Sequence, residues 1–293
     1  GPNRLSNYIV EVTQNCNFRC KYCCFSGDYV GFRHHNTLSM SGVTAKKTID
    51  FIRHHTAEEG PIYVSFYGGE SLLKFDLIKT MITALREHFG NRMIFDISTN
   101  GWLLGNDIVD YILSVPNVNV SVSLDGIAEI HDRNRLHVSG TKTYDKIVAN
   151  LLHFKGKNKE EYYKRIRILI TVGSLEDINT IDKSFDALKP LTGEKPLLIS
   201  HLLPNFSKRI LYRDSFEHKK IFIEEALRFK KAGKGNLHTM IFDELQHKRK
   251  RKFDCSDCTR IKLHTCINNL QSCFINVNGI IYPCEKVKQD CAI

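Results

Sequence analysis

Stretches in which apolar and polar residues alternate recur along most of the chain, and each is followed by a stretch whose apolar residues are three or four apart. The first pattern predicts a strand and the second an amphipathic helix. Strands are predicted over 8–13, 62–67, 93–97, 118–124, 166–172 and 197–201, and helices over 44–54, 75–89, 107–113, 144–154, 178–188 and 216–229. This alternation favours an α/β protein with a parallel sheet. Because eight such units close a full barrel, these six predict a partial (β/α)6 TIM barrel, with a doubly wound sheet as the alternative.

The pattern changes near residue 235. Beyond it come a basic run at 248–252 and a cysteine-rich tail, in which two short apolar runs flank Asn278-Gly279, a dipeptide typical of hairpin turns. We therefore expect two parts, a barrel over 3–235 and a C-terminal segment over 236–293.

Composition narrows the class of protein. The chain has 293 residues, 42% hydrophobic and 25% charged, which excludes a disordered, collagenous or coiled-coil protein. Its apolar stretches are too short to span a bilayer, so no membrane partner is expected. The ten cysteines fall into two groups, at 16–24 and 255–291, which predicts metal centres in a cytoplasmic protein rather than a disulfide lattice. The net charge of +10 favours an anionic partner, whether nucleic acid, an acidic peptide or a phosphorylated small molecule.

Three cysteines follow the first predicted strand with the spacing C-x3-C-x2-C: Cys16, Cys20 and Cys23. Each of the four irons of a cubane iron–sulfur cluster needs one further ligand, so three thiolates hold three irons and leave the fourth open to a substrate. On spacing alone, a zinc site with His34 or His35 as its fourth ligand is the alternative.

With the aromatic Tyr22 before its last cysteine, this motif resembles that of the radical S-adenosylmethionine (radical SAM) superfamily. Gly68-Gly69-Glu70, after the second strand, is similar to the family's GGE motif, which holds the methionyl amino group. Here the glycines would let the backbone approach a ligand, and the glutamate would offer an anion to an ammonium. The resemblance implies further cofactor contacts at the ends of later strands, at Ser98, Asn100, Ser123, Asp125 and Arg135. Turn and cap chemistry explains the serines and asparagines equally well.

The resemblance also implies the cofactors and the reaction. A [4Fe–4S] cluster on the three cysteines would bind S-adenosylmethionine at its open iron and pass it one electron. A 5′-deoxyadenosyl radical would then abstract a hydrogen atom from the substrate, while the protein orients the cofactor. The electron would come from a donor such as flavodoxin or ferredoxin.

The tail resembles the opening of the SPASM extension, in which an auxiliary [4Fe–4S] cluster follows the radical domain. The candidate ligands are Cys255, Cys258, Cys266, Cys273 and Cys284. Cys273 could instead face inward from the hairpin. Since the family's further cysteine block is missing before Ile293, we expect a truncated or twitch-like extension. In anaerobic sulfatase maturases a carboxylate after the cysteine acts as general base, which implies a catalytic role for Glu285; a solvated glutamate is the alternative.

SPASM proteins mostly modify peptides, so the resemblance implies an enzyme that crosslinks a precursor peptide through a thioether, carbon–carbon or carbon–oxygen bond. The basic charge suits an acidic precursor. Formylglycine formation, as in sulfatase maturases, is the first alternative. An RNA-modifying radical SAM enzyme is less favoured, because no aromatic residues interleave the basic run at 248–252. A non-catalytic, cluster-containing peptide-binding protein is a further alternative. The substrate, the bond formed and the oligomeric state do not follow from the sequence.

Overall fold

The computed structural model describes residues 5–27, 33–172, 180–193, 198–201, 224 and 272–283. Its main sheet has eight strands in the order β10-β9-β1-β3-β4-β5-β7-β8, and all neighbours are parallel except β10 and β9. The strands are β1 (Asn7–Thr13), β3 (Ile62–Gly68), β4 (Met93–Thr99), β5 (Val118–Ser123), β7 (Ile166–Val172), β8 (Leu198–His201), β9 (Ser272–Ile275) and β10 (Ile281–Tyr282).

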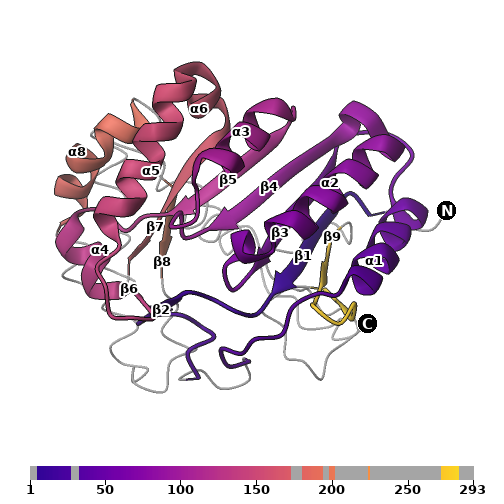
Figure 1. The fold of residues 1–293 in the computed structure, drawn as a ribbon, viewed down its shortest axis with the longest axis horizontal. Helices are drawn as coiled ribbons and strands as arrows, with labels where there is room; N and C mark the ends of the chain where they lie inside the picture. Colours follow the sequence, from indigo (N-terminus) through magenta and orange to yellow (C-terminus); the bar gives the residue numbers. More distant parts are fainter. Residues whose placement is uncertain are drawn as a thin grey trace, which may run out of the picture.

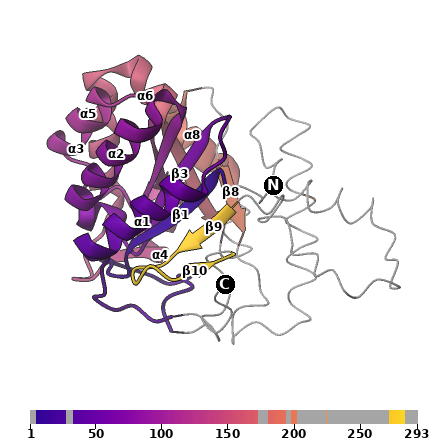
Figure 2. The ribbon, with the colours of Figure 1, turned by 90° about the vertical axis from the view of Figure 1, so that its right-hand side faces the viewer.

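Helices connect successive strands of this sheet and lie on one of its faces (Figures 1 and 2). They are α1 (Gly42–His55), α2 (Phe75–Phe89), α3 (Asn106–Ser114), α4 (Ala128–Asn134), α5 (Tyr144–Lys157), α6 (Lys159–Arg165) and α8 (Ile181–Thr192), with short 3-10 turns η1 (Ser71–Lys74) and η2 (Gly90–Arg92). From β1 to β8 the strand order follows the chain without reversal. A doubly wound sheet reverses its strand order at a switch point. The partial barrel predicted from the sequence is therefore confirmed, and the doubly wound alternative is not.

The boundaries of the predicted elements agree closely with the structure where both can be compared. The helix expected over 75–89 is α2, whose buried residues Ile78, Met81, Ile82 and Leu85 follow the helical spacing. Burial of each of these side chains stabilises the fold by about 1.5–3 kcal/mol. The expected helix over 216–229 lies outside the described residues, apart from Glu224, as does the proposed boundary near 235.

The sequence did not predict the small second sheet, in which β2 (Phe18–Cys20) pairs antiparallel with β6 (Arg135–His137). Three residues are too few to show a period, so no pattern could mark either strand. The pairing matters for the site, because β2 contains one of the three spaced cysteines. In Figure 1 the chain from the end of β1 to β2 runs across the lower edge of the main sheet.

The two faces of the sheet differ in chemistry. On β4, Met93, Phe95 and Ile97 are fully buried on the helix-covered face, where the Phe95 ring stacks on Phe66 at 6.2 Å. The alternate residues of the strands lie on the opposite, concave face, and several are polar. There Asp96 accepts two 3.0 Å hydrogen bonds from Ser121 and lies 3.6 Å from the Arg167 guanidinium. A closed barrel of this type fills its interior with branched apolar side chains, so a polar concave face suits a ligand better than a packed core.

The C-terminal hairpin is part of the main sheet. β9 pairs in parallel with β1, with Asn7 opposite Ser272 and Val10 opposite Ile275, and β10 folds back on β9. The turn at 276–279 includes Gly279 with a positive φ of 81°, as the Asn278-Gly279 signal predicted. Figure 2 shows the two yellow strands lying along β1. The hairpin expected to open a separate extension thus extends the edge of the barrel sheet.

Candidate functional site

The three spaced cysteines lie on a loop at the edge where the parallel strands end. Cys16 follows β1, Cys20 is the last residue of β2, and Cys23 lies in the turn that follows, where its amide donates to the Cys20 carbonyl at 3.0 Å. Because β2 pairs with β6, with Cys20 opposite Arg135, the loop is fixed to the segment that follows β5. The pairing of β2 with β6 thus fixes the backbone of the loop that carries the cysteines.

The environment of these thiols opposes free thiolates. Burial raises the pKa of Cys16 to about 12 and that of Cys20 to about 11. A hydrogen bond with Cys24, together with burial, raises the pKa of Cys23 to about 12, although nearby His35 lowers it. Charge repulsion from Cys20 and Cys23 also raises the pKa of Cys16, and repulsion from Cys23 raises that of Cys20. A bound cation reverses this preference, because metal coordination deprotonates a thiol.

The donor set fits an iron–sulfur cluster better than the zinc alternative. None of the three thiols is in a disulfide. Within the described ranges, no group of three His, Cys, Asp or Glu side chains is arranged to hold a metal ion. A zinc ion requires donors about 2.0–2.3 Å from one centre, whereas each thiolate of a cluster binds a different iron and so need not meet the others at one point. These three cysteines are the residues that would hold such a cluster.

The two glycines after β3 let the cysteine loop pass close to the sheet. Gly68 has a φ of 137°, and a Cβ there would lie 2.1 Å from the Thr13 carbonyl oxygen. A Cβ on Gly69 would lie 2.0 Å from the Asn15 carbonyl oxygen. The Gly69 and Glu70 amides donate to those same two carbonyls at 2.8 Å. The glycines therefore fit against the segment that leads into Cys16, rather than only leaving room for a ligand.

The Glu70 carboxylate is fully buried and already accepts three hydrogen bonds. Oε1 accepts from the Leu72 amide at 3.0 Å and the Thr99 hydroxyl at 2.6 Å, and Oε2 accepts from the Asn100 amide at 2.7 Å. Burial raises its pKa, and these donors act in the opposite direction. Since a carboxylate has about four acceptor positions, about one remains for an ammonium. Glu70 thus joins the ends of β3 and β4 as well as lying where the sequence placed a cofactor contact.

Three more of the expected contacts lie at the ends of β4 and β5. Asn100 accepts from the Trp102 amide at 3.0 Å, which is turn chemistry, but its amide nitrogen also donates to Asn17 in the cysteine loop at 2.8 Å. Ser98 and Ser123 are half-buried, and neither side chain has a hydrogen bond to another described residue. Their hydroxyl groups are thus available to a ligand on the concave face.

Tyr22, Asp125 and Arg135 come from three separate segments and meet beside Cys20. The Tyr22 hydroxyl donates to the Asp125 carboxylate and accepts from Arg135 Nη1 at 2.5 Å. The Arg135 guanidinium is 4.0 Å from the same carboxylate, and its charge lowers the pKa of the Cys20 thiol against the larger effect of burial. Burial raises the pKa of Tyr22, so its proton stays in the network. The structure therefore brings together three residues that the sequence suggested one at a time.

The Asp125 carboxylate is held on its other side by β7. Its Oδ1 accepts from the Thr171 amide at 3.0 Å, and the Asp125 amide donates to His131 Nδ1 at 3.1 Å. Sequence reasoning missed His131, because no spacing rule marks a histidine whose partners become neighbours only in the folded chain.

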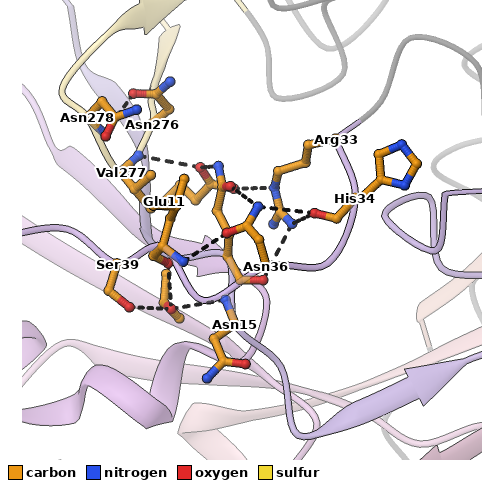
Figure 3. Close-up of polar contacts among 12 residues, drawn as sticks. Glu11, Asn15, Arg33, His34, Asn36, Ser39, Asn276, Val277 and Asn278 are labelled. Carbon is orange, nitrogen blue, oxygen red and sulfur yellow. Dashed lines mark hydrogen bonds and ion pairs between the residues drawn. The ribbon is translucent and has the colours of Figure 1, made fainter.

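A second polar network that the sequence did not reveal surrounds Glu11 on β1 (Figure 3). Glu11 Oε1 pairs with Arg33 Nε at 2.9 Å, and Oε2 accepts from Gln14 at 2.8 Å and from the Val277 amide at 3.4 Å. Gln14 in turn accepts from Asn36 at 2.6 Å. Glu11 thus joins the first strand, the segment after the cysteine loop and the C-terminal hairpin.

The tail residues are only partly covered by the structure. Cys273 lies in β9, is buried and pairs with Tyr8 of β1, and burial raises its pKa to about 12. This position corresponds to the inward-facing option for Cys273. The other candidates lie outside the described residues: Cys255, Cys258, Cys266, Cys284 and Glu285.

Among the described residues, no helix is both long enough and apolar enough to cross a membrane.

Two curated proteins are similar to the chain at moderate identity. An uncharacterized protein of Methanocaldococcus jannaschii, MJ0907, is 27% identical over 212 residues, which cover 68% of each chain. A cysteine-type anaerobic sulfatase-maturating enzyme of Clostridium novyi is 29% identical over 188 residues, which cover 63% of this chain and 48% of that enzyme. The chain therefore aligns with about half the length of this second relative.

Two solved structures share the fold. Native anSMEcpe with bound AdoMet superposes with a TM-score of 0.70 at 20% identity, covering 97% of this chain and 75% of that one. Streptococcus suis SuiB bound to its precursor peptide SuiA gives a TM-score of 0.63 at 15% identity, covering 96% and 60%.

The family comparison agrees with the geometry of the site. The family model described as the radical SAM superfamily matches residues 10–188, a span that includes all three spaced cysteines, Gly68-Gly69-Glu70, Asp125 and Arg135. The chain is an enzyme of the radical SAM superfamily, whose cofactors are a [4Fe–4S] cluster and S-adenosylmethionine.

Proposed function

We propose that the chain is a peptide maturase that cleaves S-adenosylmethionine reductively, removes a hydrogen atom from a precursor peptide and forms a crosslink in it. The observation that carries this proposal is the meeting of Cys20 with Tyr22, Asp125 and Arg135 at the carboxyl edge of the sheet. A buried cation and a buried anion beside a metal-binding thiol suit a zwitterionic cofactor.

Bound at this edge, the cluster and S-adenosylmethionine supply a carbon radical that can break an unreactive C–H bond. The protein's part is to hold the cofactor and exclude water. Cys16, Cys20 and Cys23 hold the cluster. Arg135 would bind the cofactor carboxylate and the Gly68–Glu70 segment its amino group, while Ser98 and Ser123 would offer hydroxyls from the strand ends.

The substrate we infer is a peptide, preferably acidic. SuiB, which shares the fold, was solved with a precursor peptide, and this chain has a net charge of +10. Its concave face offers polar groups, including Arg167 with half of its side chain exposed, and backbone carbonyls and carboxylates are acceptors that a guanidinium recognises. A small redox protein such as flavodoxin or ferredoxin would supply the electron, and the cytoplasm would keep the thiols reduced. The tail cysteines other than the buried Cys273, with Glu285 as a base, would form an auxiliary [4Fe–4S] site in residues 236–293.

Formylglycine formation is the second candidate, and the sulfatase-maturating relative favours it. The product mass separates the two reactions. A crosslink lowers the peptide mass by two hydrogen atoms, whereas conversion of cysteine to formylglycine also replaces sulfur by oxygen.

The test is cofactor cleavage by protein purified without oxygen and reconstituted with iron and sulfide. We expect the reduced wild-type protein to form 5′-deoxyadenosine, and the Cys16→Ala/Cys20→Ala/Cys23→Ala variant to form none. Cys24→Ala is the matched control, because it removes a thiol adjacent to the motif, and it should retain activity. Failure of a fully loaded wild-type protein to cleave the cofactor would overturn the proposal.

A further inference from the structure

A continuous chain of hydrogen bonds joins the Asp125 turn to Arg135, and it runs through His131 on α4. The Asp125 amide donates to His131 Nδ1 at 3.1 Å, His131 Nε2 lies 2.9 Å from Thr143 Oγ1, and Thr143 Oγ1 donates to the Arg135 carbonyl at 2.6 Å. His131 and Thr143 are both fully buried. Neither residue contacts the cysteine loop through these bonds. This series of hydrogen bonds can therefore affect the site only through Asp125 and Arg135.

The donors and acceptors fix the tautomer of His131. Because a backbone amide can only donate, Nδ1 must accept, and the single ring proton must be on Nε2. Since the Thr143 hydroxyl donates its own proton to the Arg135 carbonyl, it accepts from Nε2. Burial, reinforced by the charge of Arg135, lowers the pKa of His131 to about 2, so the imidazole stays neutral and Nδ1 keeps its lone pair.

A second set of bonds holds Thr143 in place. Asp132 Oδ1 accepts from the amides of Thr143 and Tyr144, both at 2.9 Å, at the start of α5. The Tyr144 ring packs edge-on against the imidazole, with the ring centroids 5.7 Å apart. His131 therefore bridges two fixed points, the turn after β5 and the strand β6.

We propose that His131 is a positioning residue that sets the separation of the Asp125 carboxylate and the Arg135 guanidinium, and with it the affinity for S-adenosylmethionine. This inference rests on the proposed function, which assigns Asp125 and Arg135 to the cofactor. The two groups are 4.0 Å apart, and the Tyr22 hydroxyl bonds to both. Residues 126–134, including α4, connect Asp125 to Arg135 along the chain, and the relay through His131 and Thr143 ties the two ends of this connection together by hydrogen bonds. Supporting groups of this kind hold a site near its productive geometry.

The relay can be cut one bond at a time. His131→Asn keeps an acceptor for the Asp125 amide but is too short to reach Thr143. His131→Gln reaches Thr143 but gives up the acceptor near the main chain. His131→Phe removes both bonds and keeps the ring, and Thr143→Val removes the hydroxyl alone.

The readout is the dissociation constant for S-adenosylmethionine, measured by anaerobic equilibrium dialysis on reconstituted protein, with iron content and the EPR spectrum recorded in parallel. We expect His131→Phe and Thr143→Val to weaken binding about 10- to 100-fold, the range found when outer-sphere partners of a site are removed, with iron content unchanged. The Asn and Gln variants should lie between these and wild type, and Thr143→Ser should restore most of the affinity.

Thr48→Val is the matched control. Thr48 is also a buried threonine, its hydroxyl has no hydrogen-bond partner among the described residues, and it lies on α1. This change should leave the affinity unaltered. A second readout needs no cofactor: hydrogen exchange at the Asp125 amide should accelerate in His131→Phe and His131→Gln but not in Thr48→Val.

The outcomes separate the two proposals. Wild-type protein that binds and cleaves the cofactor, with His131→Phe and Thr143→Val binding equally well, would overturn the role of His131 alone. Wild-type protein that neither binds nor cleaves the cofactor would overturn the proposed function and this inference together. Should His131→Phe fail to fold, Thr143→Val against Thr143→Ser decides the question.

Discussion

Two buried arginines, Arg33 and Arg135, differ in how they pair with a carboxylate. The Arg33 side chain is 7% exposed and bonds directly to Glu11 at 2.9 Å, and its guanidinium lies 3.6 Å from the centre of the Phe25 ring. The Arg135 side chain is 8% exposed, but Asp125 is 4.0 Å away and the Tyr22 hydroxyl lies between them. Similar burial thus accompanies one closed ion pair and one open pair.

The difference indicates that one pair serves stability and the other serves ligand binding. In the closed pair, Arg33 and Glu11 neutralise each other's charge. The Glu11 network therefore stabilises the fold by holding the segment after the cysteine loop and the hairpin to β1. An open pair keeps hydrogen-bonding capacity for a ligand. The clearest way to break this comparison is to remove one member of each network and ask whether stability or cofactor binding changes.

The largest effect on stability is expected for Arg33→Leu. It leaves the Glu11 carboxylate buried without its cation, which should lower the free energy of unfolding by about 3–5 kcal/mol. Chemical denaturation measures this loss, and hydrogen exchange should accelerate at the Val277 amide, which donates to Glu11.

The double variant Glu11→Leu/Arg33→Leu is the control for that prediction. With no unpaired charge left, it should recover much of the lost stability. A double variant as unstable as the sum of the two single variants would show that the pair is not coupled.

Next in size is Gly68→Ala, at about 2–4 kcal/mol. A Cβ there must move the Thr13 carbonyl and adopt a positive φ, which combines overpacking with backbone strain. Gly140→Ala is the matched comparison, because Gly140 also has a positive φ but nothing lies within 4 Å of its Cβ position. The thermal midpoint of Gly68→Ala should be the lower of the two; equal midpoints would contradict the close approach of β3 to the cysteine loop.

Acid should destabilise the protein through His131. Below pH 6.5 the unfolded chain takes up a proton at this residue, which the folded protein does not bind until about pH 2. The free energy of unfolding therefore falls as pH decreases through this window, by about 2–3 kcal/mol between roughly pH 7.5 and 4.5. Glu70 and Asp96 act in the opposite direction, because burial raises their pKa values.

Comparison with His131→Gln isolates this contribution, since glutamine does not titrate. Denaturation curves across the pH range should converge as the pH falls, with the wild type losing the extra stability. Parallel curves would show that His131 has the same pKa in the folded and unfolded states, against the lowered pKa expected from its burial.

The smallest of these effects on stability is expected for Tyr22→Phe, at about 1.5–3 kcal/mol, the range for a hydrogen bond to charged groups. Relative to its loss of stability, Tyr22→Phe should weaken cofactor binding more than Arg33→Leu does, because Tyr22 bonds to both members of the open pair. Dialysis of S-adenosylmethionine against both variants gives the comparison, and equal loss of affinity in the two would remove the distinction between the arginines.

The barrel was predictable because its strands and helices carry their own period. Each strand hides alternate residues under helices, as in Met93, Phe95 and Ile97, so the pattern follows burial directly. The pairing of β2 with β6 was not predictable, since neither strand is long enough to show a period. The place of the hairpin beside β1 was also hidden, because an apolar run does not say which edge it joins.

The site, like the fold, has features that the sequence could predict and features that it could not. Spacing along the chain was enough to predict Cys16, Cys20 and Cys23 as cluster ligands, because the three are close in sequence. Three features depend on contacts between separate segments: the hydrogen bonds that the Glu70 oxygens accept, the network at Glu11 and the relay through His131. No local pattern encodes such contacts, so these features needed the fold.

The pairing of β9 with β1 has a consequence for how the chain folds during its synthesis. Asn7–Val10 leave the ribosome before their neighbours Ser272–Ile275, which emerge more than 260 residues later. Until then one side of β1 is an open strand edge, and open edges recruit other chains. Folding from the N-terminus can complete the β1–β3 pairing long before that edge is covered. A nascent chain or fragment that stops before residue 272 therefore exposes an unpaired edge of β1, and we expect it to aggregate more readily than the chain that includes β9.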